Sequence, residues 1–323
     1  MFSVVIPLYN KAAYIQKAIN SVLKQTFVEF ELIIVNDGST DDSVSKINLF
    51  TDKRIKIIHQ FNSGVSWARN NGVRNSIFDY IAFLDADDWW DEFFLEKIHL
   101  LIQDYSEAAI FGTQYFWVKN KIFTPSINNK EKGYRGFIDY NTAYLYAWWM
   151  PLSSISVVVR KQAFERLGGF KESLKFGEDL DLWIRFSLEY KIAYLNEPLA
   201  YYNQNVEENS RALGADKFWT LKEHVLFNQS FLAEYELKSS NLKQLLDGLR
   251  VRSLVTYHLK GWYPQEVQML LSLVNLSQQP LYYRFVYRWP RPIVSAYFLF
   301  KRFGSLAKKY LFLNYNRFRI RQY

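Results

Sequence analysis

Tyr80-Ile81-Ala82-Phe83-Leu84-Asp85-Ala86-Asp87-Asp88 joins a short apolar run to a cluster of acids, and this junction indicates the fold. The apolar part is brief and uninterrupted, which is typical of a strand buried on both faces of a parallel sheet. In such sheets, ligands bind beyond the carboxyl ends of the strands. The three aspartates therefore stand where this topology predicts a ligand.

The first hundred residues alternate strand patterns with helix patterns. Short apolar runs predict strands at 4–8, 32–35, 55–58 and 80–84. Apolar residues at helical spacing predict helices at 12–26 and 65–74, and a further helix beginning at 41–42. Such alternation predicts an α/β fold, a mainly parallel sheet with helices on both faces. Two other strand ends are also polar, at Asn10 and at 36–39.

The pattern loosens from about Ala108. Strands are predicted at 110–118, 154–159 and 192–202, and helices at 161–167 and 180–190. Residues 216 to about 275 predict two or three helices. We therefore expect a sheet domain at 1–205, with halves at 1–105 and 106–205, followed by a helical C-terminal region at 206–323.

The acidic cluster at 85–88 suits a metal ion, although a simpler explanation exists. Three carboxylates this close repel one another, which favours a bound cation or raised pKa values. Oxygen ligands without His or Cys point to a hard ion, Mg²⁺ or Mn²⁺. The alternative is a solvated acidic turn that caps the next helix. The residues alone leave both explanations open.

Three other segments each allow a structural and a functional explanation. Asp37 could accept hydrogen bonds from a base or ribose, or could belong to an ordinary strand-to-helix turn. Arg69 lies in a helix that begins after Gly64, and the free N–H groups at such a helix start suit an anion. Arg69 could reach a phosphate or stack on a base, or it could be a surface arginine of an amphipathic helix. Glu178 and Asp179 start a helix, so they could cap it or supply a general base.

In their order and spacing, these segments resemble family 2 glycosyltransferases of the GT-A fold. The resemblance covers about residues 1–205, with no departure at the key acids. The matching segments are 4–10, 36–41, 64–72, 83–88 and 177–185.

The resemblance implies roles for individual residues. It implies a nucleotide-sugar pocket formed by Pro7, Tyr9, Asn10, Asp37, Arg69, Asp85, Ala86 and Asp87. It implies that Asp87 and Asp88 bind Mg²⁺ or Mn²⁺, and that Asp179 is the catalytic base with Glu178 beside it. It implies an acceptor side formed by Trp148, Trp149, Gly169, Phe170, Trp183 and Arg185.

The function implied is that of a metal-dependent inverting glycosyltransferase of bacterial surface-polysaccharide type. Its donor would be a nucleoside-diphosphate sugar, UDP-linked, and its acceptor a hydroxyl of a glycan or lipid-linked glycan. One alternative is a non-catalytic nucleotide-sugar or carbohydrate-binding protein of the same fold. Another is a nucleotidyltransferase, which would need a phosphate-gripping loop rich in Gly and Lys where only Lys11 stands. The sugar itself is not identified.

Composition excludes some chemistry and singles out the tail. With no cysteine, the chain has no disulfide, no thiol catalysis and no cysteine-ligated zinc. The net charge is +8, yet residues 267–323 contain ten Lys or Arg and no Asp or Glu. Neither a signal peptide nor an apolar run long enough to span a bilayer is expected.

The basic tail is also rich in Tyr, Phe and Trp, a combination that suits an anionic membrane surface. We therefore expect attachment through 281–323, and a cytoplasmic protein peripheral to the inner face of the cell membrane. Alternatives are helices packed back on the enzyme or a dimer interface, and the oligomeric state is not predicted. Nucleic-acid binding is not expected, because no recognised binding module is present.

Overall fold

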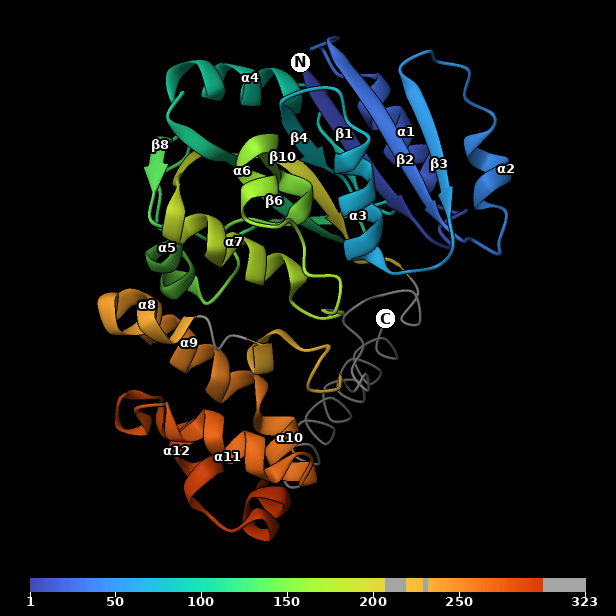
Figure 1. Ribbon diagram of the computed structural model, residues 1–323. Coiled ribbons are helices and arrows are strands. Elements are labelled where there is room, and N and C mark those ends of the chain that lie inside the picture. Colours follow the sequence, from blue (N-terminus) through green and yellow to red (C-terminus); the bar gives the residue numbers. More distant parts are fainter. Residues whose placement is uncertain (207–218, 229–231, 299–323) are drawn as a thin grey trace, which may run out of the picture. The chain divides into compact units, whose positions relative to one another are not determined.

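The computed structural model describes residues 1–206, 219–228 and 232–298 (Figure 1). The chain forms two compact units, Met1–Tyr235 and Glu236–Tyr323. The boundary falls within helix α8 (Ala233–Lys238), later than the one that we expected at 205. Each unit is described by itself.

The first unit contains one large sheet and the helices that cover it. Its strands are β1 (Phe2–Leu8), β2 (Phe30–Asp37), β3 (Ile55–Gln60), β4 (Tyr80–Phe83), β5 (Trp89–Trp90), β6 (Ala108–Lys119), β7 (Ile122–Pro125), β8 (Arg135–Ile138), β9 (Val157–Arg160) and β10 (Lys191–Asn203). Its helices are α1 (Ile15–Leu23), α2 (Ser43–Ile47), α3 (Val65–Arg74), α4 (Phe94–Asp104), α5 (Tyr140–Ala147), α6 (Lys161–Arg166) and α7 (Glu178–Glu189), with short 3₁₀ turns η1 (Ser154–Ser156) and η3 (Val225–Asn228).

The sheet has ten strands, with the main order β3-β2-β1-β4-β9-β6-β10-β5. The strands β3, β2, β1 and β4 are parallel to one another, as the alternating pattern predicts. Beyond β4 the sheet becomes mixed, because β9 runs antiparallel to both β4 and β6, while β10 runs parallel to β6. The fold is therefore α/β, with its parallel strands gathered in the N-terminal half.

Helices cover both faces of the parallel half (Figure 1). On one face, the buried stripe of α1, which includes Ile15 and Ile19, shares a core with Val4 and Ile6 of β1. On the other face, α3 packs Ala68 against β2. Gly72 of α3 lies so close to Val5 that a side chain would not fit, which lets this helix lie tightly against the sheet.

Residues 154–159, predicted as one strand, instead form the 3₁₀ turn η1 followed by β9. Ser153 and Ser156 explain the difference, because their side chains form a reciprocal capping box that satisfies the first turn. The apolar run resumes as a strand at Val157.

The second unit is helical, as predicted for the C-terminal region. After α8 come α9 (Ser240–Ser253), α10 (Val255–Lys260), α11 (Pro264–Ser272), the 3₁₀ turn η5 (Leu276–Gln278) and α12 (Leu281–Arg288). Buried inside it, Arg250 pairs with Glu236 and Asp247. Within the described residues, no helix is long and apolar enough to cross a membrane. Of the tail expected to bind a membrane, 299–323 lie outside the described residues.

Candidate functional site

The ends of β1, β2 and β4 lie side by side at one edge of the sheet. Leu8 pairs with Asn36, and Val5 with Phe83, so the polar segments that follow these strands emerge together. Asn10 adopts a left-handed conformation with φ of 49°, and its side-chain oxygen accepts a hydrogen bond from the Thr40 amide at 2.8 Å. This bond ties the end of β1 to the loop after β2. The predicted convergence of the strand ends is therefore present.

Asp37 ends β2 and is almost fully buried. Its carboxylate accepts three hydrogen bonds of 2.8 Å, from the side chain of Gln60 and from the amides of Ser63 and Gly64. The Asp37 carboxylate therefore holds the loop that leads into α3. Any contact with a base would use the acceptor capacity that these three bonds leave.

Arg69 of α3 is buried, with a side chain 4% exposed, and it joins two acidic segments that are far apart in the sequence. Its guanidinium donates to Asp85 at 2.7 Å and to Glu178 at 3.1 Å. Burial acts to lower the pKa of Arg69, but the attraction of Asp85 and Glu178 outweighs it and raises that pKa. Arg69 therefore holds the loop after β4 against the start of α7.

The other two acids after β4 are bound differently. Asp87 forms an ion pair of 2.7 Å with the ammonium of Lys11, which follows β1. Asp88 is 2% exposed, and one of its oxygens accepts a hydrogen bond from the Asn203 amide at 2.7 Å. Its other oxygen, Oδ2, is buried without a hydrogen-bond partner among the described residues.

The two carboxyl groups fit a divalent cation. Burial and the neighbouring acids raise the pKa of Asp88 well above its ordinary value, and burial also raises the pKa of Asp87 against the opposing effect of Lys11. Mg²⁺ usually takes one or two carboxylates and completes its shell with water and substrate phosphates. In the described part of the chain, no cluster of three or more His, Cys, Asp or Glu is placed to hold a metal. Asp87 and Asp88 would therefore hold the ion together with phosphate oxygens.

Asp179 lies at the first turn of α7, beside Glu178. Its Oδ1 accepts a hydrogen bond of 2.7 Å from the amide of Leu180. Burial and the charge of Glu178 raise the pKa of Asp179 to about 7, although Arg69 acts to lower it. A carboxylate with a pKa near neutrality suits a general base.

Three residues that we expected on the acceptor side make contacts within the protein, and two of them, Trp183 and Phe170, lie in its interior. Trp183 and Phe170 are fully buried and pack edge to face at 6.1 Å, so neither ring offers a face to a sugar. Arg185 donates to Asp181 and to the carbonyls of Leu167 and Gly169. These side chains pack and hold the 167–170 turn.

The 167–170 turn is also held from α3. Asn70 donates to the carbonyl of Phe170 at 2.8 Å and accepts from its amide at 3.0 Å. Gly169 has φ of +65°, and a Cβ there would lie 2.8 Å from the Asn70 oxygen, so this position requires glycine.

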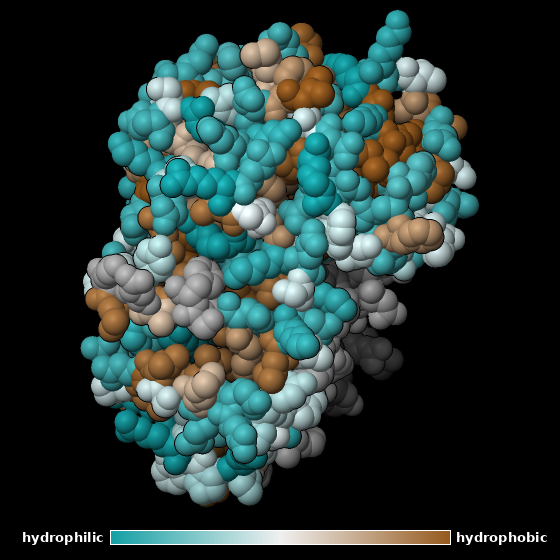
Figure 2. Space-filling model, in the orientation of Figure 1, coloured by the Kyte–Doolittle hydropathy of each residue, from teal (hydrophilic) through white to brown (hydrophobic). Residues whose placement is uncertain are grey.

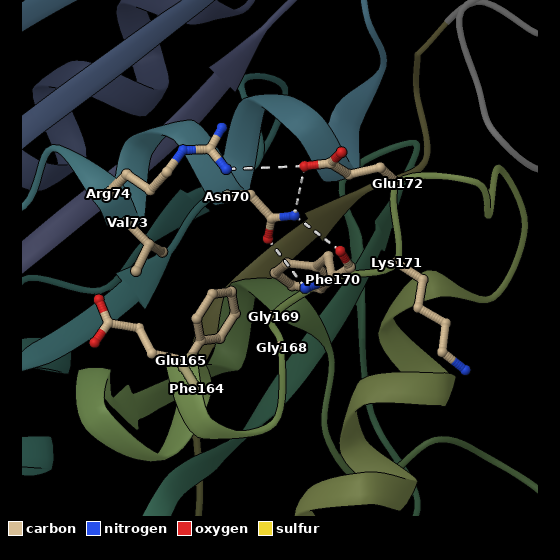
Figure 3. Close-up of a pocket in the computed structure, with 10 residues that line it drawn as sticks. All are labelled: Asn70, Val73, Arg74, Phe164, Glu165, Gly168, Gly169, Phe170, Lys171 and Glu172. Carbon is tan, nitrogen blue, oxygen red and sulfur yellow. Dashed lines mark hydrogen bonds and ion pairs between the residues drawn. The ribbon is translucent and has the colours of Figure 1, made fainter. Parts of the chain in front are cut away.

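A pocket of about 470 Å³ opens beside this turn (Figure 3). Its lining comes from α3, α6 and the 168–172 segment, and comprises Asn70, Val73, Arg74, Phe164, Glu165, Gly168, Gly169, Phe170, Lys171 and Glu172. None of the acids at 85–88 or 178–179 lines it. The pocket is therefore distinct from the sheet edge where the carboxylates gather.

Trp149 is half-buried, and its indole donates to Tyr115 at 3.0 Å while its ring meets Trp117 edge to face at 4.7 Å. Trp117 in turn packs on Tyr202 at 4.8 Å. Trp148 ends α5 in a left-handed conformation, with φ of 51°.

Sequence reasoning missed two groups at the sheet edge. Burial and the charges of Asp88 and Asp85 raise the pKa of Tyr202 in β10, so this side chain belongs to the electrostatic surroundings of the acids. Lys11 forms the ion pair with Asp87 described above. The position of Lys11 shortly after the first strand was the one available signal. The sequence could not show that Lys11 pairs with Asp87, which is 76 positions away. No signal in the sequence links Tyr202 to the acids.

Comparisons with known proteins agree with this architecture. Residues 3–168, about half of the chain, match the family described as glycosyl transferase family 2. A protein of Rickettsia felis named as an uncharacterized glycosyltransferase is 34% identical over 204 residues, which are 61% of this chain and 32% of that protein. This chain thus spans about a third of that relative. The minor teichoic acid biosynthesis protein GgaA of Bacillus subtilis is 28% identical over 298 residues, 87% of this chain and 64% of GgaA.

Among solved structures, S. aureus TarS 1–349 in complex with UDP-GlcNAc has a TM-score of 0.68 and 20% identity, covering 88% of this chain and 86% of that one. This likeness supports the predicted GT-A fold. The family match spans the four parallel strands, Arg69 and the acids after β4. The chain belongs to glycosyl transferase family 2.

Proposed function

We propose that this protein transfers a sugar from a nucleoside-diphosphate sugar, UDP-linked, to a hydroxyl group of a glycan or lipid-linked glycan. The observation that carries the proposal is the joining of two acidic segments by Arg69, which brings Asp85 and Glu178 together over the ends of the parallel strands. Family membership supports the reaction class, and the complex of TarS with UDP-GlcNAc supports the donor class.

The reaction would be a single displacement. Asp179 takes the proton of the acceptor hydroxyl, whose oxygen forms a bond to the anomeric carbon as the bond from that carbon to the diphosphate oxygen breaks. Attack opposite the leaving group inverts the anomeric centre. A pKa of about 7 leaves a substantial fraction of Asp179 ionised at neutral pH and able to accept the proton.

Arg69 would keep Asp179 in place through Glu178, and Asn10 and Asp37 would shape the nucleotide end through the loops that they hold. A divalent ion held by Asp87 and Asp88 would supply positive charge to the departing diphosphate. Tyr9, which follows β1 and is 45% exposed, would contact the nucleotide. Trp148 and Trp149 remain our candidates for the acceptor side.

The proposal is tested by incubating the protein with nucleoside diphosphates and nucleotide-sugars in the presence of Mn²⁺. We expect a rise in Tm with UDP or UDP-sugars, because ligands that bind the folded state stabilise it. With the stabilising donor and candidate acceptors, UDP should be released, and EDTA should abolish its release until Mn²⁺ or Mg²⁺ is restored. Release of pyrophosphate would instead indicate a nucleotidyltransferase, and binding without turnover would indicate a non-catalytic protein. Full activity in EDTA would refute the role given to the metal.

We also propose that the second unit attaches to an anionic membrane surface. Residues 288–293 are exposed throughout and combine Arg288 and Arg291 with Trp289 and Ile293, which are 53% and 47% exposed. Figure 2 shows apolar residues exposed among polar ones on the visible face of this unit. Aromatic rings and arginines together suit the headgroup region of a bilayer.

Co-sedimentation with phosphatidylcholine vesicles, with and without phosphatidylglycerol, tests this attachment. We expect binding only to the anionic vesicles, weakened about tenfold or more by Arg288→Gln with Arg291→Gln, because each basic residue contributes about 1 kcal/mol. Lys53→Gln with Ile77→Ala, at exposed positions of the first unit, is the control. Equal binding of all three proteins would count against the proposal.

A further inference from the structure

Lys11 has a fixed backbone and an ammonium that lies on one of the acids. Its amide donates to Ser43 Oγ at 2.9 Å, and its carbonyl accepts from the amides of Tyr14 and Ile15 at 2.9 and 3.0 Å. The side chain is 14% exposed, and Nζ lies 2.7 Å from Oδ2 of Asp87. The backbone of Lys11 is therefore held on both sides, while its long side chain can turn about its own bonds.

Among the described residues, the acids at this edge outnumber the basic groups that contact them. Arg69 pairs with Asp85 and with Glu178, so its donors are directed away from the other two acids after β4. Lys11 pairs with Asp87. Oδ2 of Asp88 has no hydrogen-bond partner among the described residues, although Asp88 is 2% exposed.

Lys17 is another basic side chain among the described residues whose charge acts on these acids. Its charge interacts with that of Asp88, but its ammonium lies over the ring of Trp89. Of the two lysines, Lys11 is therefore the one whose ammonium forms an ion pair with Asp87, a candidate ligand of the divalent ion.

We propose that Lys11 is an exchangeable counter-ion, which occupies Asp87 before the donor binds and moves to the diphosphate when a divalent ion takes its place. This inference rests on the proposed function. An ammonium and a divalent cation repel each other, so they compete for Asp87. A nucleoside diphosphate supplies phosphate oxygens that an ammonium can bind.

The exchange predicts that removing the Lys11 ammonium changes the affinities for Mn²⁺ and for UDP in opposite directions. Removing the ammonium in Lys11→Met should strengthen the binding of Mn²⁺ alone, because a competitor for Asp87 is gone. The same variant should weaken the binding of UDP in saturating Mn²⁺, because a cation that contacts phosphate is lost. A purely structural role for Lys11 would weaken both.

Calorimetric titration of wild type, Lys11→Met, Lys11→Gln and Lys17→Met tests the inference, with Mn²⁺ alone and with UDP in saturating Mn²⁺. For both Lys11 variants we expect Mn²⁺ to bind about fivefold more tightly and UDP about tenfold more weakly. Lys17→Met should change the two affinities in the same direction or leave them unchanged.

Equal affinities in wild type and the Lys11 variants, or changes of the same sign for both ligands, would overturn the role of Lys11 while leaving the proposed function intact. Lys11→Gln keeps a polar side chain, so a fold defect confined to Lys11→Met would show as disagreement between the two variants, and Lys11→Gln would then decide. A wild-type protein that binds neither Mn²⁺ nor UDP would overturn the proposed function and this inference together.

Discussion

Asp179 and Asp181 lie two positions apart at the start of α7, yet their surroundings differ completely. Asp181 is buried and paired with Lys171 at 2.6 Å and with Arg185 at 2.6 Å. Asp179 instead sits beside Glu178, which also carries negative charge, and its pKa rises to about 7. One carboxylate is matched by positive charge, and the other is left able to gain and lose a proton.

The same contrast separates larger regions of the molecule. In the second unit, the buried Asp247 and the partly buried Glu236 pair with Arg250 and Lys243, so this cluster of described residues holds two acids and two bases. At the sheet edge, acids exceed the basic groups that contact them, and a buried oxygen of Asp88 has no partner among the described residues. Removing one partner of a buried ion pair destabilises a fold, whereas an excess of one charge sign favours a ligand of the other sign.

The largest predicted effect on this contrast between matched and unmatched acids is a change in the rate of sugar transfer. Asp179→Asn should lower transfer about a thousandfold, because the amide cannot accept the proton of the acceptor, and general-base catalysis contributes on this scale. Its affinity for UDP with Mn²⁺ should stay close to that of wild type. Rates of UDP release and calorimetric titration measure the two quantities. Near-normal turnover of Asp179→Asn would contradict the assignment of Asp179 as a base.

Asp181→Asn should act on stability. The amide has nearly the same shape but removes the buried carboxylate that Lys171 and Arg185 contact, and breaking a buried pair such as Asp181–Arg185 costs about 3 kcal/mol. Denaturant unfolding should show a lower free energy of unfolding. Any folded fraction should keep its affinity for UDP with Mn²⁺, and unchanged stability would show that Asp181 is not a structural ion-pair partner.

Asp179→Asn should raise the free energy of unfolding, whereas Asp181→Asn should lower it. The folded-state pKa of Asp179 is raised from 3.8 to about 7, so its contribution to stability is present below pH 3.8 and lost as the pH rises through 7. The neutral amide avoids this loss. We expect Asp179→Asn to be more stable than wild type by a few kcal/mol at pH 8, with the difference shrinking at pH 5. Thermal unfolding at both pH values measures it, and a variant less stable than wild type at pH 8 would contradict the account.

The sequence predicted the parallel half of the sheet well, because buried strands such as β1 are continuously apolar and α1 carries a clear apolar stripe. It could not show which motif residues pack inside. Trp183 and Arg185 belong to the 177–185 segment that resembles the family. That resemblance does not tell whether a side chain contacts a ligand or holds a neighbouring turn.

Contacts over long distances in the sequence were the other gap. Lys11 and Asp87 meet because β1 and β4 are neighbours in the sheet, and Arg69 reaches Glu178 across 109 positions. The antiparallel strands after β4 were also difficult to place, because capping by Ser153 and Ser156 starts β9 later than its apolar run suggests.

The pH dependence of transfer tests the central claim most directly. With an identified donor and acceptor, UDP release should be followed from pH 5 to 9 in wild type and in Asp179→Asn, which retains the Asp181 pairs. We predict that kcat/KM of wild type rises with pH through a midpoint near 7, as Asp179 loses its proton, and that the residual activity of the variant lacks this rise. The same midpoint in the variant, or turnover close to that of wild type, would contradict the assignment of Asp179 as the base.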